Sequence, residues 1–153
     1  MNNFNPLYGS CSCNNVSYII NNKPLFTQAC HCKNCKISTG SSFVIHTMIF
    51  EDDLVVKGEV SSTELPTGSG KGYRAYFCIK CGVYLYCKYN VAKGRIAIRS
   101  ATLEKPIKPQ AHIFIKDKDP WIEISNEDIC HDTMYDREIT WPKESLLRLK
   151  NRS

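Results

Sequence analysis

Nine cysteines in 153 residues are the part of this sequence whose spacing could support chemistry. Three of them, Cys30, Cys32 and Cys35, lie within residues 29–35. Spacings of two and three residues let these sulfurs turn inward on one tight loop, and Zn²⁺ binds converging thiolates well. Disulfides make little geometric sense at such close spacing. We therefore interpret the run as a metal-binding loop.

Two further cysteine pairs lie far from this loop in the sequence. The N-terminal pair is Cys11 and Cys13, and the distal pair is Cys78 and Cys81. Spacing alone first suggests a zinc ribbon that joins the distal pair to Cys32-x-x-Cys35. That gap is much longer than in a usual ribbon, and three cysteines are left without a role. Joining the N-terminal and distal pairs instead gives one closed four-thiolate site.

The second pairing leaves the residues of the central loop as a site with three thiolates and a free fourth position. Closed zinc sites hold structure, whereas an open position allows chemistry. Zinc on three thiolates is formally anionic. It therefore lowers the pKa of a bound water less than zinc on three neutral histidines does. Such a site favours a sulfur substrate, which would react as a thiolate with a carbonyl carbon.

Length and composition indicate a single globular domain. The apolar fraction of 42% and the charged fraction of 23% are ordinary for that class. No segment has the pattern of a signal peptide or of a membrane span, so we expect a cytoplasmic protein with no membrane partner. An odd number of clustered cysteines fits a reducing compartment. The net charge of +5 is scattered along the chain, which disfavours nucleic-acid binding.

Short extended segments separated by turn residues dominate the pattern. The predicted strands are residues 43–50, 54–56, 61–65, 73–77, 83–89, 95–99 and 111–115. We expect residues 14–20 and 25–29 to form a hairpin, residues 37–42 to form a small polar loop, and Trp121 to anchor the core. Only residues 143–150, after Pro142, show a helical period. The pattern predicts an all-β fold with two metal-stapled sheets and a short C-terminal helix.

The motifs appear in the order found in one known family and run from about Gly9 to Ile124. They are Gly9-Ser10-Cys11-x-Cys13, Cys30-His31-Cys32-x-x-Cys35, Gly40-Ser41, Phe77-Cys78-x-x-Cys81-Gly82, Thr102-Leu103-Glu104, His112 and Pro120-Trp121. In these the sequence resembles the glutathione-dependent formaldehyde-activating enzyme family (GFA), which also contains centromere-associated CENP-V relatives. All seven family cysteines are present at the expected spacings.

The resemblance implies two zinc ions per chain. The structural zinc is expected on Cys11, Cys13, Cys78 and Cys81, and the catalytic zinc on Cys30, Cys32 and Cys35. It also implies a GFA-like zinc-binding domain over residues 1–125, with two antiparallel sheets spreading from the metal sites in a β-tent-like arrangement. Residues 126–153 would be a C-terminal extension.

The activity implied is that of a carbon–sulfur lyase of the S-hydroxymethylglutathione synthase type. A thiol such as glutathione would be added to formaldehyde or a related small aldehyde, or the adduct would be cleaved. We expect substrate contacts from Thr39, Gly40, Ser41 and Arg74, although Arg74 lies one place further from Phe77 than the family pattern has it. The sequence does not decide which thiol and which aldehyde react, or whether the chain forms a homodimer.

The main alternative is a non-catalytic zinc-binding scaffold or interaction module, because similarity of fold does not transfer activity. His46 is relevant to this choice, since a histidine ligand would close the second site. We expect His31 and His46 to be hydrogen-bonded structural residues instead. Cys87 is interpreted as a packing residue and Cys130 as an incidental residue of the tail.

Overall fold

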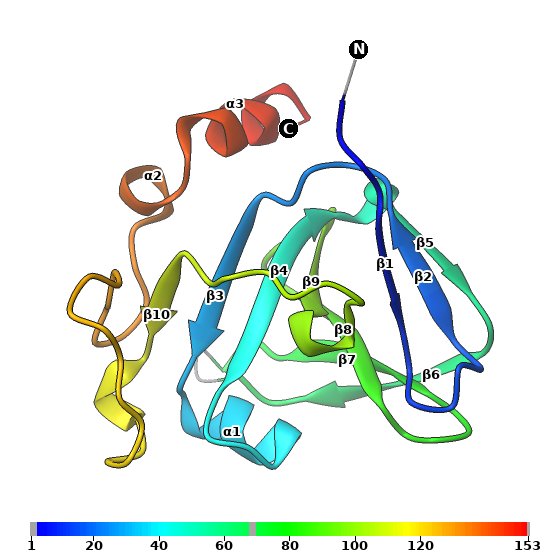
Figure 1. Cartoon of the computed structure of the whole chain (residues 1–153), viewed down its shortest axis with the longest axis horizontal. Helices are drawn as coiled ribbons and strands as arrows, with labels where there is room; N and C mark the ends of the chain where they lie inside the picture. Colours follow the sequence, from blue (N-terminus) through cyan, green and yellow to red (C-terminus); the bar gives the residue numbers. More distant parts are fainter. Residues whose placement is uncertain (1–2, 68–69, 153) are drawn as a thin grey trace.

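The computed structural model describes residues 3–67 and 70–152, and its strands form two sheets (Figure 1). The small sheet is antiparallel and has the order β1 (Leu7–Ser10), β2 (Ser17–Ile20), β5 (Leu54–Lys57). The large sheet has the order β10 (Ala111–Ile113), β3 (Phe26–Cys30), β4 (Val44–Phe50), β9 (Arg95–Arg99), β8 (Tyr84–Tyr89), β7 (Tyr73–Cys78), β6 (Val60–Leu65). Within it only the β10–β3 pair is parallel among the described strands.

Three α-helices and three short 3₁₀ turns complete the described chain. The helices are α1 (Lys33–Thr39), α2 (Arg137–Thr140) and α3 (Lys143–Asn151), and the turns are η1 (Glu51–Asp53), η2 (Ser100–Thr102) and η3 (Ile115–Asp117). The predicted class is confirmed: the protein is mostly β, with two sheets and a short C-terminal helix. Within the described ranges, no helix has both the length and the apolar character needed to cross a bilayer.

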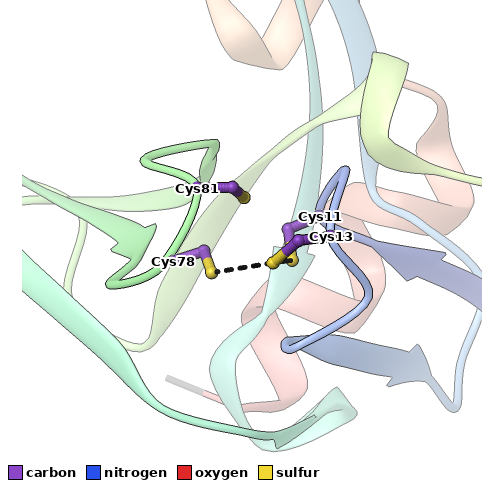
Figure 2. A group of neighbouring side chains, drawn as sticks. All are labelled: Cys11, Cys13, Cys78 and Cys81. Atoms are coloured by element: carbon purple, nitrogen blue, oxygen red, sulfur yellow. Dashed lines mark hydrogen bonds between the residues drawn. The ribbon is translucent and has the colours of Figure 1, made fainter.

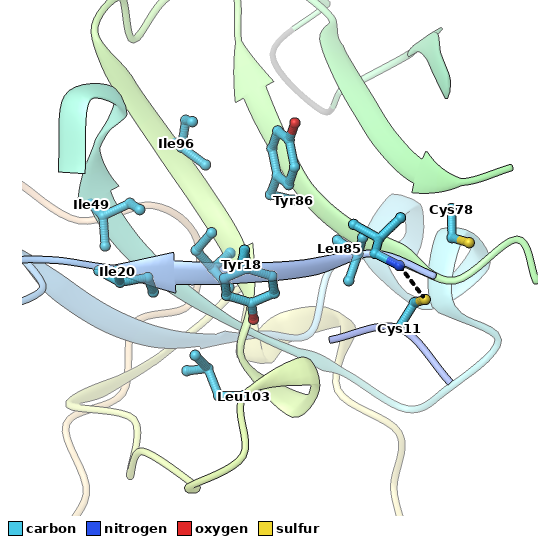
Figure 3. Packing of buried hydrophobic residues seen from close by; sticks show 11 residues of the cluster. Cys11, Tyr18, Ile20, Ile49, Cys78, Leu85, Tyr86, Ile96 and Leu103 are labelled. Carbon is cyan, nitrogen blue, oxygen red and sulfur yellow. Dashed lines mark hydrogen bonds between the residues drawn. The ribbon is translucent and has the colours of Figure 1, made fainter. Parts of the chain in front are cut away.

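The first part of the core fills the space between the two sheets (Figure 3). Alternation along a strand sends every second side chain to the same face, so Tyr18 and Ile20 of β2 meet Ile96 of β9. Cys11 and Cys78 belong to the same buried cluster. The core therefore extends directly into one of the cysteine groups.

The other face of the large sheet is covered by the C-terminal segment, which Figure 1 shows on the side away from the small sheet. Trp141 is buried and stacks on Phe26 of β3 with ring centroids 5.5 Å apart. Leu146 and Leu149 of α3 pack against the same cluster. The proposed extension thus contributes core contacts, and its boundary at residue 125 remains a prediction.

Several local expectations were wrong. The segments expected as a hairpin belong to different sheets, because β2 pairs with β1 and β5 whereas β3 pairs with β4 and β10. The first half of the expected polar loop, residues 37–39, instead belongs to α1, which is capped by Gly40 in the left-handed conformation (φ 63°). Trp121 does not anchor the core, since its exposed fraction is 73%.

Candidate functional site

Four cysteines meet where β1 and β7 end (Figure 2). The Sγ atoms of Cys11 and Cys13 are 3.6 Å apart, those of Cys13 and Cys78 are 3.7 Å apart, and all four, Cys81 included, lie within 4.8 Å of one another. Tetrahedral zinc with Zn–S bonds of about 2.3 Å requires sulfur–sulfur distances of about 3.8 Å. The four sulfurs therefore fit a closed tetrahedral zinc site.

The backbone on both sides of this four-cysteine group is arranged to present sulfur. Gly82 has a φ of 74° and donates its N–H to the carbonyl of Cys78 at 2.9 Å, which turns the chain back after the second cysteine of the pair. On the other side, the N–H of Val16 donates to the Sγ of Cys11 at 3.3 Å. This hydrogen bond fixes the direction of the Cys11 sulfur within the group.

Cys30, Cys32 and Cys35 form the second group, with all three Sγ atoms within 4.8 Å of one another. Cys30 is the last residue of β3, and Cys32 is the N-cap of α1, where its Sγ accepts the N–H of Cys35 at 3.4 Å. Residues three apart on a helix share one face, which keeps the sulfurs of this three-cysteine group together. The first turn of α1 is thus capped by a member of the three-cysteine group.

The sulfurs of the three-cysteine group interact strongly with one another. The thiols of Cys30 and Cys35 donate to the sulfur of Cys32, and this lowers the pKa of Cys32 far below its ordinary value. The pKa of Cys35 is raised, because hydrogen bonds to Cys30 and then to Cys32 favour its protonated thiol. One thiolate is already favoured in this cluster, and all three of its ligands are soft sulfur donors. Such a cluster suits Zn²⁺.

Within the part of the chain that the structure describes, no histidine or carboxylate joins the three sulfurs as a fourth ligand. His46 is buried nearby, and burial, followed by the charge of Arg99, lowers its pKa to about 3. His31 turns away to His112, with 3.1 Å between its Nε2 and the Nδ1 of His112. Three ligands and a free position are what this group offers.

The expected substrate contacts are divided between two places. Thr39, Gly40 and Ser41 lie at the exposed end of α1, where the hydroxyl of Thr39 donates to the carbonyl of Cys35 at 2.7 Å. Arg74 lies on β7 and pairs with Glu64 at 2.9 Å. Alternation along β7 directs Arg74 away from the face that carries Tyr73 and Ala75. These four residues stay predictions.

Sequence reasoning missed a buried basic residue beside the three-cysteine group. Arg99, at the end of β9, is 5% exposed and donates from Nη2 to the hydroxyl of Ser38 on α1 at 3.0 Å. Ser38 in turn donates to the carbonyl of Cys35 at 3.1 Å. In the sequence, Arg95 to Arg99 alternates like a strand with arginines on its solvent face, so no local signal indicates this burial.

The chain belongs to the glutathione-dependent formaldehyde-activating enzyme family, whose model matches residues 6–117. Among solved structures, the crystal structure of a Rhodobacter sphaeroides protein, a structural-genomics target, is similar with a TM-score of 0.48 and 21% identity over 67% of this chain and 91% of that chain. A comparison with curated proteins gave no significant match.

Proposed function

We propose that this protein is a carbon–sulfur lyase of the S-hydroxymethylglutathione synthase type. In the synthetic direction the thiol loses its proton, its sulfur bonds to the carbon of formaldehyde or a related small aldehyde, and the carbonyl oxygen takes up a proton. The reverse direction cleaves the same carbon–sulfur bond. The observation that carries the proposal is the three-cysteine group without a fourth protein ligand among the described residues.

Cys30, Cys32 and Cys35 would hold the catalytic zinc, and the four-cysteine group would hold a structural one. Zinc bound by three thiolates would supply an open coordination position that prefers a soft sulfur ligand to water. The chain's own contribution is to fix this group between a strand end and a helix cap, so that little rearrangement is needed when a substrate binds.

The substrate would approach along α1. No residue of α1 is buried, and its carboxyl end presents the hydroxyl groups of Thr39 and Ser41 next to Gly40. We retain these three as proposed contacts to glutathione or a similar thiol. Arg74 stays a prediction from the sequence, because β7 directs it to the face of the sheet opposite Tyr73 and Ala75. A cytoplasmic location, where glutathione is the abundant thiol, would suit this reaction.

The test is NMR exchange spectroscopy of formaldehyde with glutathione, with and without the zinc-loaded protein, repeated with other small thiols. Cys32→Ser is the informative variant, because serine is also a good N-cap and keeps α1 while removing a sulfur. Cys130→Ser, at an exposed cysteine outside both groups, is the matched control.

We expect the wild type and Cys130→Ser to accelerate exchange and Cys32→Ser to lose the acceleration. If the protein binds two zinc ions and accelerates exchange with no thiol, the proposal fails, and a non-catalytic zinc module replaces it. If Cys32→Ser keeps both its zinc content and its activity, the three-cysteine group is not the active site.

A further inference from the structure

Arg99 is a buried cation whose hydrogen-bonding groups are only partly used. Its Nη2 donates to Ser38, whereas Nε and Nη1 are buried without a partner. The guanidinium lies 3.8 Å from the centroid of the Tyr84 ring, and no acidic side chain among the described residues forms an ion pair with it. Arginine stays protonated in proteins, and burying an unpaired charge is costly. The position is therefore suited to an anion.

A second partly satisfied group lies directly opposite. His46 of β4 pairs in register with Arg99 of β9, so their side chains share one face of the large sheet. His46 is 2% exposed and its Nε2 has no partner. Two buried nitrogen-bearing side chains on adjacent strands thus present unpartnered nitrogen atoms to the same region.

This region adjoins the three-cysteine group. Cys30 pairs with Val44, two residues from His46 on the same face, so Cys30 and His46 are diagonal neighbours at about 7–8 Å. On the other side, Ser38 connects Arg99 to the carbonyl of Cys35. A molecule with its sulfur at the cysteines and an anionic group a few bonds away would span the two places.

We infer that Arg99 binds the carboxylate of the thiol substrate, and that the preferred substrates are thiol carboxylic acids, a class that includes glutathione. The carboxylate joins or replaces Ser38 on the guanidinium, and His46, in the tautomer with hydrogen on Nε2, donates to the second oxygen. The inference rests on the proposed function only in placing the substrate sulfur at the three-cysteine group.

The test compares two thiols of similar size, 3-mercaptopropionate and 2-mercaptoethanol, by calorimetric titration of the zinc-loaded protein without aldehyde. We expect the acid to bind roughly tenfold or more tightly, as charge-assisted hydrogen bonds allow. Arg99→Gln should abolish this ratio. Arg95→Gln, on the same strand and face but four residues away, should keep it. Propionate, which has no sulfur, should compete with 3-mercaptopropionate.

A second measurement is made on the wild-type protein itself, and a variant serves only to assign the signal. The Nε–H signal of Arg99 in the wild-type protein, assigned through its loss in Arg99→Lys, should shift with 3-mercaptopropionate and with propionate but not with 2-mercaptoethanol. An unshifted signal, or equal affinity for both thiols in the wild type, overturns the inference. The binding titration contains no aldehyde, so it tests this inference separately from catalysis. Tighter binding of the acid, together with no acceleration of aldehyde–thiol exchange, would contradict the proposed function and leave the inference standing.

Discussion

The imidazoles of His31 and His112 are hydrogen bonded to each other, with 3.1 Å between Nε2 of His31 and Nδ1 of His112. Burial lowers the pKa of His31 to about 4 and holds that of His112 below its ordinary value, so this is a pair of neutral rings at pH 7. The backbone N–H of His31 also donates to Ile113 at 3.0 Å. Strand β10 therefore holds the loop between Cys30 and Cys32.

Replacing His112 by phenylalanine should loosen this loop. The buried Nε2 of His31 would lose its partner, which costs about 1–3 kcal/mol of the free energy of unfolding. Denaturant titration of the zinc-loaded protein measures this loss, and a chelator should remove zinc from the three-cysteine group faster. His112→Asn, whose amide can replace the ring nitrogen, should recover most of the stability. Equal stability of the two variants would contradict the role given to the pair.

Gly82→Ala should weaken the four-cysteine group through the backbone. Its φ of 74° is unfavourable for alanine by about 1 kcal/mol, although an added Cβ would meet no atom within 4 Å. Gly94, with a φ of 73° and the same open surroundings, is the matched control. Both variants should lose similar thermal stability, and only Gly82→Ala should release structural zinc more readily to a chelator. Equal zinc retention would show that the turn does not set the ligand geometry.

Lys36→Met should make α1 less firmly held. Lys36 joins this helix to the segment after β10 through Asp119 at 2.7 Å and the carbonyl of Asp117 at 2.8 Å. Because no residue of α1 is buried, polar contacts and the cysteines hold it in place. We expect zinc to leave the three-cysteine group roughly two- to fivefold faster. Lys33→Met, at an exposed position of the same helix, should leave the rate unchanged.

The two tryptophans should differ widely in their contribution to stability. Trp141 is 6% exposed and stacks on Phe26, so Trp141→Ala should cost about 3–5 kcal/mol. Trp121 is 73% exposed, and Trp121→Ala should change stability by less than about 0.5 kcal/mol. Thermal and denaturant unfolding measure both. A small effect at Trp141 would mean that the large sheet is stable without its C-terminal cover.

The cysteine groups could be predicted from the sequence because their signals are local. A spacing such as Cys78-x-x-Cys81-Gly82 sets a tight turn whatever the rest of the chain does, and the family resemblance implies which pairs belong together. Most strands were also predictable, since alternation and β-branched residues act over a few positions. The helical period after Pro142 gave α3 with nearly the right bounds.

What could not be predicted depends on contacts between distant segments. Helix α1 has no apolar face, and it forms around a cysteine cap. The burial of Arg99 depends on its register with His46 and on the contact with Ser38. Neither contact can be predicted from the residues next to Arg99 in the sequence. The hairpin expected from residues 14–20 and 25–29 failed because turn residues indicate only that the chain turns, whereas sheet pairing decides its partner.

The two cysteine groups also differ in the length of chain that each must close. Cys13 and Cys78 are 65 residues apart, whereas Cys30 and Cys35 lie within one short segment. Closing a long loop costs more chain entropy and must wait for distant strands to meet. A newly made chain can therefore capture metal at its local group while it is still largely unfolded. We therefore expect the group that links the two sheets to be assembled last and its metal binding to complete folding.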